Sequence, residues 1–250
     1  MSRAAVIGAG LMGSGIAQVS AVGGHDVIMR DVDDAALARG MAGIEKSLAR
    51  FVAKGSLTQA DADAAIARID TTTSLEDAVS QADIVVEAVF ENLDVKKQMF
   101  QQLEDIVAAD CILATNTSSL PVTSIAAACQ RPERVAGFHF FNPVPLMKIV
   151  EVVDGLLTAP WAAEALLALG QRMGHTAVRA SDTPGFIVNH AGRGFVTEAL
   201  RILGEGVASF ADVDRIMREG AGFRMGPFEL LDLTGLDVSH PVMESIYRQY

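Results

Sequence analysis

The sequence predicts an α/β fold in which a doubly wound, mainly parallel sheet is followed by an all-helical C-terminal domain. Short apolar runs typical of buried strands alternate with helical segments as far as residue 180, and this alternation favours parallel strands joined by helices. A turn-rich segment follows at 181–185, and beyond it the chain has helical character. We therefore expect a first domain over residues 1–183, with a helical insert at 34–68, and a helical domain over 184–250.

A glycine-rich turn follows the first apolar run. Residues 8–13 read GAGLMG, a match to G-x-G-x-x-G between a predicted strand and a predicted helix. Gly8 permits the tight turn, Gly10 lets a pyrophosphate approach the backbone, and Gly13 lets the helix pack on the strand. The helix N-terminus offers N–H groups and a positive dipole end to phosphates. The motif predicts a Rossmann-type dinucleotide site. The expected contacts are Gly8, Gly10, Leu11, Met12 and Gly13.

The second strand predicts which dinucleotide binds. The apolar run Val27–Met29 ends at Arg30 and Asp31. A carboxylate at this place accepts hydrogen bonds from the adenosine ribose and repels a 2′-phosphate, so Asp31 favours NAD over NADP. Arg30 keeps the alternative open, since an arginine can accept a 2′-phosphate. The other reading of the whole segment is an ordinary βαβ unit with a glycine-rich turn.

Composition limits the classes of function. Of the 250 residues, 50% are hydrophobic and 20% are charged, as in a globular protein. The net charge of −11 argues against nucleic-acid binding and means that an anionic substrate needs a local basic patch. Cys111 and Cys129 follow no metal-binding spacing and favour a reduced, cytoplasmic protein without a metal site. We expect no membrane span, and the early glycines argue against a signal peptide.

The helical insert carries a basic face. A helix is predicted over 34–54, where Gly55 ends it, and a second helix runs to Arg68. Lys46, Arg50 and Lys54 fall at i, i+4 and i+8, so they share one side of the first helix. They form either a phosphate contact or a solvated surface, and the spacing alone does not decide between the two.

Polar residues follow two predicted core strands, 82–89 and 112–114. Ligands of doubly wound sheets bind beyond the carboxyl ends of the strands, which places Glu91, Asn116 and Ser118 near the cofactor. The alternative for the serines is structural: either Ser118 or Ser119 is expected to cap a helix that begins near residue 122.

A histidine and a glutamate interrupt two apolar runs. His139 lies in an aromatic run over 135–143, and Glu151 lies in a strand predicted over 148–153. A histidine in such a run is usually a core residue, but an unpaired buried carboxylate would be costly. If the two strands are neighbours, Glu151 can accept a hydrogen bond from one ring nitrogen of His139. The other nitrogen is then available to take a proton, which predicts a general base.

The C-terminal part begins after a last strand, predicted over 176–180. Helices are expected over about 186–203 and 211–219, and again after residue 227. The first of these helices is rich in apolar residues, which indicates burial against another domain or another subunit. We therefore expect a homodimer assembled through the C-terminal domain.

Four stretches resemble the 3-hydroxyacyl-CoA dehydrogenase family, and its short bacterial members in particular. The resemblance extends from Val6 to Tyr250. It is carried, in this order, by residues 86–92 (VEAVFEN), 116–119 (NTSS), 137–143 (GFHFFNP) and 182–189 (DTPGFIVN). The family usually continues for several tens of residues beyond the point where this sequence stops, which points to an incomplete helical domain.

The resemblance implies NAD-dependent, reversible oxidation of an (S)-3-hydroxyacyl-CoA to a 3-oxoacyl-CoA, with a short-chain substrate such as 3-hydroxybutyryl-CoA. It implies that His139, paired with Glu151, is the general base. It also implies that Ser118 and Asn189 hold the reacting oxygen or the thioester carbonyl. The further residues implied near the cofactor are Glu91, Lys96 and Asn142, and those implied near CoA are Ser47 and Lys54.

Two alternatives remain open. Another hydroxyacid or sugar-acid dehydrogenase would share the glycine motif, including Met12, but such enzymes typically use a catalytic lysine on a helix. The other alternative is a non-enzymatic, crystallin-like NAD-binding protein, and the combination of His139 and Glu151 with Ser118 and Asn189 argues against it. Fold alone does not separate these readings. Acyl chain length, direction and pathway stay open, since fatty-acid, butyrate-type and aromatic-degradation roles would each fit.

Overall fold

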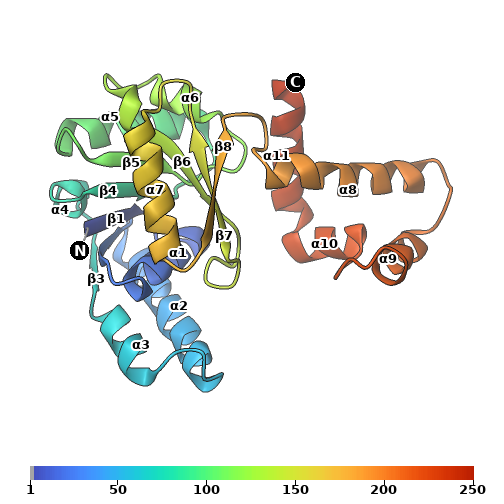
Figure 1. Cartoon of the computed structure of the whole chain (residues 1–250), viewed down its shortest axis with the longest axis horizontal. Coiled ribbons are helices and arrows are strands. Elements are labelled where there is room, and N and C mark those ends of the chain that lie inside the picture. Colours follow the sequence, from blue (N-terminus) through green and yellow to red (C-terminus); the bar gives the residue numbers. More distant parts are fainter. Residues whose placement is uncertain (1–2) are drawn as a thin grey trace. The chain divides into compact units, whose positions relative to one another are not determined.

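The computed structural model describes residues 3–250. The chain divides into two compact units, the first ending at Asp182 and the second beginning at Thr183. The first unit contains a sheet flanked by helices, and the second contains helices only (Figure 1). None of the described helices is long and apolar enough to cross a membrane.

Within the described residues, the first unit is built on an eight-stranded sheet in the order β3-β2-β1-β4-β5-β6-β7-β8. Every neighbouring pair is parallel except β6 and β7, which are antiparallel. The chain changes direction of travel across the sheet between β1 and β4, and ligands of such sheets bind at this switch point. The predicted doubly wound, mainly parallel sheet is confirmed. The strands are β1 (Arg3–Ile7), β2 (Asp26–Arg30), β3 (Ile69–Thr72), β4 (Ile84–Glu87), β5 (Ile112–Thr115), β6 (Val135–Phe140), β7 (Ile149–Asp154) and β8 (Thr176–Ser181).

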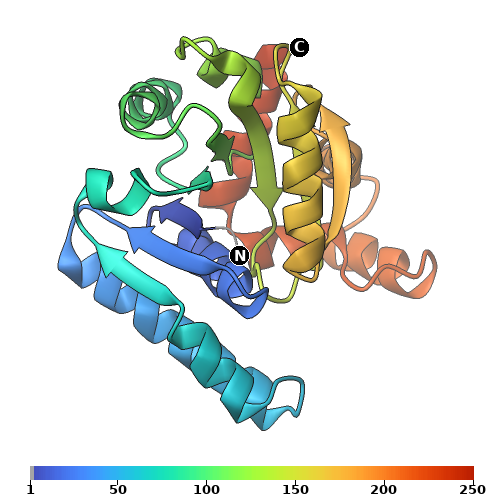
Figure 2. The same ribbon diagram turned by 60° about the vertical axis from the view of Figure 1, so that its left-hand side comes forward.

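Helices cover both faces of this sheet, as Figures 1 and 2 show. Successive side chains of a strand point to opposite faces, so each face has its own core. In β1, Val6 packs in the core of α1, α2 and α7, whereas Ala5 and Ile7 pack in the core of α4, α5 and α6. The helices are α1 (Leu11–Val22), α2 (Asp34–Ala53), α3 (Gln59–Ile66), α4 (Leu75–Val79), α5 (Leu93–Ile106), α6 (Val122–Ala126) and α7 (Pro160–Arg172), with a short 3₁₀ helix at Pro132–Arg134.

The same alternation decides where the polar residues of β6 and β7 point. Phe138 and Phe140 belong to the core of α1, α2 and α7, with their rings packed edge to face at 4.6 Å. His139, between them, therefore lies on the opposite face of the sheet. Glu151 likewise lies between two residues of that first core. Both polar side chains consequently lie on one face.

The insert consists of α2 and α3, which pack against each other (Figure 1). Asp33 caps α2 by accepting a hydrogen bond from the N–H of Ala36. Thr58 caps α3 by accepting one from Asp61. Gly55, with a φ of 68°, allows the chain to leave the first helix and turn toward the second.

Two features of the first unit differ from the sequence-based expectation. β3 was not predicted, because it is a short edge strand with a single buried apolar residue. The expectation that Ser118 or Ser119 caps the helix near 122 was wrong. The N–H groups of Val122 and Thr123 donate instead to the two carboxylate oxygens of Asp182, at 3.0 and 2.7 Å. Asp182 is the last residue of the first unit and lies far from the helix in sequence. No local sequence pattern therefore predicts this cap.

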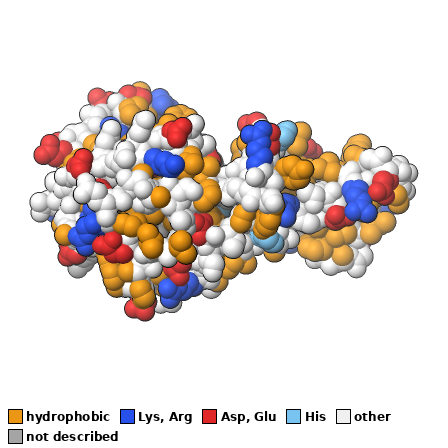
Figure 3. Space-filling model, turned by 90° about the horizontal axis from the view of Figure 1, so that it is seen from above, with side chains coloured by type: hydrophobic (Ala, Val, Ile, Leu, Met, Phe, Trp, Pro, Cys, Tyr) orange, Lys and Arg blue, Asp and Glu red, His pale blue; other side chains and the backbone are white. Residues whose placement is uncertain are grey.

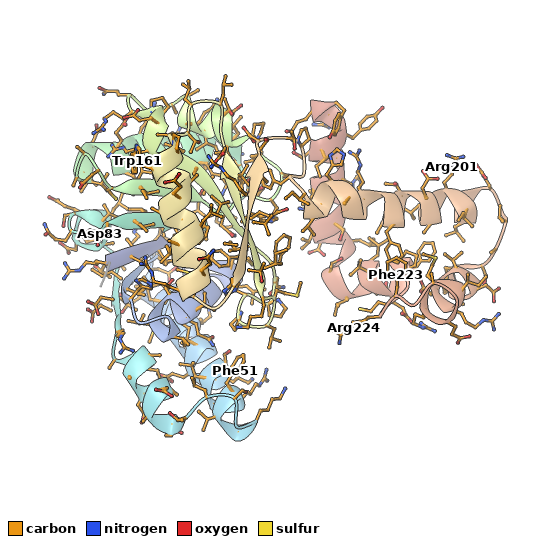
Figure 4. All side chains as sticks on the ribbon, viewed as in Figure 1. Phe51, Asp83, Trp161, Arg201, Phe223 and Arg224 are labelled. Atoms are coloured by element: carbon orange, nitrogen blue, oxygen red, sulfur yellow. The ribbon has the colours of Figure 1, made fainter. Side chains whose placement is uncertain are left out.

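The described part of the second unit is all-helical, as predicted. Its helices are α8 (Val188–Gly204), α9 (Phe210–Glu219), α10 (Pro227–Thr234) and α11 (Leu236–Gln249). The buried carboxylate of Asp214 in α9 accepts hydrogen bonds from the N–H groups of Phe228 and Glu229 and so caps α10. The ring of Phe223, labelled in Figure 4, packs at 4.6 Å from that of Phe195 on α8. These contacts join α8, α9 and α10, and α11 packs against α10.

Candidate active site

The glycine-rich turn connects β1 to α1 at the switch point of the sheet. Gly8 has a φ of 109°, and a Cβ added there would lie 2.6 Å from the carbonyl oxygen of Ala88. A Cβ on Gly13 would lie 1.8 Å from the carbonyl oxygen of Gly8, so neither position accepts another residue. A Cβ on Gly10 would meet no atom within 4 Å. The space beside the N-terminus of α1 can therefore admit a phosphate group, as a dinucleotide requires.

Asp31 is fixed beside this turn. Its carboxylate accepts hydrogen bonds from the N–H of Ala9 and from its neighbour Val32, both at 2.7 Å. The first bond joins the end of β2 directly to the glycine turn, so the acid and the phosphate cradle are held as one site. Arg30 is engaged elsewhere, because its Nε donates to the carbonyl oxygen of Thr73 at 3.2 Å. This geometry fits a ribose diol better than a 2′-phosphate.

His139, Glu151 and Ser118 form a hydrogen-bonded set. His139 and Glu151 are direct partners in the antiparallel register of β6 and β7. Glu151 Oε2 lies 2.6 Å from His139 Nδ1, and Ser118 Oγ lies 3.0 Å from His139 Nε2. The exposed fraction is 2% for His139 and 0% for Glu151. The sequence predicted that Glu151 pairs with His139 if their strands are neighbours. The strands are neighbours, and the pair is present.

This arrangement orients the imidazole. A carboxylate facing Nδ1 accepts a hydrogen bond from the Nδ1–H group and stabilises the tautomer in which Nε2 carries the lone pair. Nε2 then faces the Ser118 hydroxyl and whatever oxygen is bound next to it. Asn116 supports the same edge of the sheet, because its Oδ1 accepts a hydrogen bond from the N–H of Phe140 at 2.8 Å. Such a set can remove a proton from a hydroxyl group.

Lys96 and Glu91 lie beside the Ser118 turn. Lys96, only 1% exposed, places Nζ 2.6 Å from Glu87 Oε1 and 3.5 Å from Glu91 Oε2. Burial alone would raise the pKa of Glu91, but the charge of Lys96 and hydrogen bonds from residues 117–119 outweigh it and hold this pKa below its usual value. Glu91 is therefore ionised at neutral pH. Glu87 was missed by the sequence analysis, although an acid inside an apolar strand is the same signal that revealed Glu151.

The other predicted residues lie outside this cluster of contacts. Lys46 and Arg50 are exposed on α2, Lys54 follows its last residue, and Ser47 is half-buried among them. Asn142 is exposed just after β6. Asn189 lies at the start of α8, in the second unit. Their roles toward cofactor and substrate stay predictions. Within residues 3–250, no three His, Cys, Asp or Glu side chains are grouped to hold a metal ion.

Comparison with known protein families shows to which family the chain belongs. Residues 3–183 match the model of the 3-hydroxyacyl-CoA dehydrogenase NAD-binding domain, and residues 185–250 match that of the C-terminal domain of the same enzymes. The chain belongs to the 3-hydroxyacyl-CoA dehydrogenase family. The resemblance seen in the sequence is thereby confirmed, and NAD is the cofactor of this family's first domain.

Individual 3-hydroxyacyl-CoA dehydrogenases are similar over nearly the whole chain. The 3-hydroxyadipyl-CoA dehydrogenase of Escherichia coli is 46% identical over 98% of this chain, which spans only 52% of that relative's length. The probable 3-hydroxybutyryl-CoA dehydrogenase of Bacillus subtilis is 45% identical over 97% of this chain and 84% of its own. The crystal structure of (S)-3-hydroxybutyryl-CoA dehydrogenase from Ralstonia eutropha is 41% identical and superimposes with a TM-score of 0.96, covering 100% of this chain and 88% of that one.

Proposed function

We propose that this protein is an NAD-dependent dehydrogenase that interconverts (S)-3-hydroxyacyl-CoA and 3-oxoacyl-CoA. The observation that carries the proposal is the Glu151–His139–Ser118 set on a sheet that also presents a dinucleotide cradle. Family membership supports the reaction class, and the hydrogen-bonded set supports activity over a non-enzymatic NAD-binding role. The absence of a lysine from this set argues against the mechanism of other hydroxyacid dehydrogenases.

The residues act on the proton of the 3-hydroxyl. His139 accepts this proton at Nε2, and Glu151 stabilises the imidazolium that forms at Nδ1. The Ser118 hydroxyl donates a hydrogen bond to the same substrate oxygen as it gains carbonyl character. Asn189 is assigned to the reacting oxygen or to the thioester carbonyl. NAD supplies the acceptor for the hydride that leaves C3. In the reverse direction His139 returns the proton, so one arrangement serves both directions.

The CoA moiety needs a local cationic surface, because the net charge of the chain is −11. On the face shown in Figure 3, basic side chains are dispersed among acidic and apolar ones. Lys46 and Arg50 are exposed in the C-terminal half of α2, beside Ser47, and Lys54 is exposed directly after the helix. We assign Lys54 and Ser47 to the CoA phosphates on this basis.

The acyl chain is proposed to be short, as in 3-hydroxybutyryl-CoA, after the substrates named for several relatives. Comparing NADH oxidation with acetoacetyl-CoA, acetoacetate and a keto sugar acid tests the assignment. Acetoacetyl-CoA should be the best substrate by far. A higher kcat/KM with the keto sugar acid would refute it in favour of a sugar-acid dehydrogenase.

We also propose a cytoplasmic homodimer. Large apolar side chains are exposed on the second unit, and two free cysteines suit a reducing compartment. Apart from two tyrosines, the most exposed of these side chains are Val207, Phe210, Ile216, Leu233 and Leu236. Light scattering that detects only monomer at micromolar concentration would contradict the dimer.

A further inference from the structure

A buried ion pair ties the ends of β4 and β5 together. Glu87 ends β4 and is the register partner of Thr115, which ends β5. Glu87 Oε2 accepts a hydrogen bond from Thr115 Oγ1 at 2.8 Å, and its Oε1 accepts from Lys96 Nζ at 2.6 Å and from the N–H of Val89 at 2.7 Å. Both charged side chains are at most 1% exposed. Lys96 on α5 is thus held in one place by the sheet.

Glu91 connects this anchor to the turn after β5. Its Oε2 lies 3.5 Å from Lys96 Nζ. Its Oε1 accepts from four donors on three consecutive residues: Thr117 Oγ1 at 2.6 Å, the N–H of Ser118 at 3.0 Å, the N–H of Ser119 at 3.1 Å and Ser119 Oγ at 3.1 Å. Because Glu91 is ionised, these are charge-assisted hydrogen bonds, which are stronger than neutral ones. One carboxylate oxygen therefore fixes the conformation of residues 117–119.

Ser118 is held through its backbone and through its side chain. Its backbone N–H donates to Glu91, and its Oγ lies 3.0 Å from His139 Nε2. The position of the hydroxyl follows from the position of the backbone that carries it. The chain of contacts runs from Glu87 through Lys96 and Glu91 to Ser118, and it ends at the imidazole.

We propose that Glu91, anchored by Lys96 and Glu87, is a positioning residue that sets the Ser118 hydroxyl against His139. This inference rests on the proposed dehydrogenase function and assigns Glu91 a task beyond cofactor proximity. A misplacement of about 1 Å can cost about 10²-fold in rate, so loosening the turn lowers kcat without removing any reacting group.

A double-mutant cycle with Ser118 separates positioning from other roles. Glu91→Ala should lower kcat with acetoacetyl-CoA by about 10- to 100-fold in the wild-type background. In the Ser118→Ala background there is no hydroxyl left to position, so the same change should lower kcat by no more than about twofold. This is about the scatter within which independent mutational effects add. Glu91→Gln keeps an acceptor oxygen and should retain more turnover than Glu91→Ala. Because Glu91 is also expected near the cofactor, kcat is measured at saturating NADH, so that a change in the Kd of NADH does not contribute to the loss.

Glu104 supplies a matched control. Glu104 lies in α5, the helix that follows Glu91 in the chain. Its carboxylate accepts hydrogen bonds from the N–H groups of Gln130 and Arg131 at 2.6 and 2.9 Å and pairs with buried Arg134. These contacts hold the loop before β6. Because β5 and β6 are parallel neighbours, this loop lies at the opposite end of the strands from Ser118, which follows β5. Glu104→Ala should lower Tm and leave kcat unchanged, which separates loss of stability from loss of positioning.

Three results would overturn the inference. They are an equal kcat loss from Glu91→Ala in both backgrounds, an unchanged kcat, or a defect that disappears when NADH is saturating. Should Glu91→Ala fail to fold, Thr117→Val removes the shortest donor to Glu91 with little change of shape, and the same cycle with Ser118→Ala applies. A wild-type protein that does not turn over acetoacetyl-CoA would refute the proposed function itself, a result distinct from the first three.

Discussion

Glu151 lies directly opposite His139 in the antiparallel pair of β6 and β7, with its Oε2 2.6 Å from Nδ1 of the imidazole. Both side chains are buried, so the charge of the carboxylate acts on the imidazole with little screening by water. Glu151→Gln preserves the shape but removes the charge that stabilises the imidazolium. We expect kcat to fall to a value between those of the wild type and His139→Gln, with NADH affinity nearly kept. Stopped-flow turnover and NADH titration measure the two quantities, and an unaltered kcat would show that the pair is only structural.

Asp31 predicts cofactor preference. Its carboxylate is fixed beside the glycine turn by the N–H of Ala9, where a 2′-phosphate would meet a like charge. NAD(H) should be used with a higher kcat/KM than NADP(H), and Asp31→Ala should narrow the difference. Arg30→Ala is the control and should leave the preference intact, since Arg30 is bound to Thr73. Equal efficiency with both cofactors in the wild type would refute the assignment.

Lys54 predicts how CoA is recognised. If it meets a CoA phosphate, Lys54→Ala should raise KM for acetoacetyl-CoA and leave KM for acetoacetyl-pantetheine almost unchanged, since the shorter substrate lacks the phosphates. The ratio of KM for acetoacetyl-pantetheine to KM for acetoacetyl-CoA should therefore be smaller in Lys54→Ala than in the wild type. Lys97→Ala, a lysine on α5, serves as control and should affect neither value. An equal effect of Lys54→Ala on both substrates would mean that it supports the fold alone.

Several elements of the site could be read from the sequence because their signals are local. The glycine turn is recognised by the spacing of its glycines. His139 and Glu151 are recognised because they are polar residues inside apolar strands. The Asp182 cap of α6 and the anchoring of Lys96 by Glu87 could not be read in this way. Both depend on tertiary contacts between segments whose neighbourhood only the folded sheet defines. β3 escaped prediction because an edge strand with one buried residue carries almost no periodic signal.

His175 predicts a pH dependence of stability. Burial is the main cause that lowers its pKa below the usual 6.5, and hydrogen bonds to the carbonyl groups of Val144 and Met173 only partly offset it. The unfolded chain therefore binds a proton more readily than the native protein does. The stability contribution of neutral His175 is complete above pH 6.5 and is lost as the pH falls through the lowered native pKa.

Thermal unfolding between neutral pH and about pH 5 measures this effect. The wild-type Tm should fall across this range, and His175→Gln should show a flatter profile. His190→Gln, which replaces an exposed histidine of the second unit, is the control and should follow the wild type. Parallel profiles for the wild type and His175→Gln would remove His175 as the cause.

The most direct test of the account is the rate of NADH oxidation with acetoacetyl-CoA in the wild type and in His139→Gln. The wild type should turn over, and His139→Gln should lose about 10²- to 10⁴-fold in kcat, the usual contribution of a positioned general base, while its NADH Kd stays close to that of the wild type. His175→Gln, which alters another buried histidine of the same unit, should retain kcat at neutral pH. A His139→Gln enzyme with near-normal turnover would contradict the mechanism.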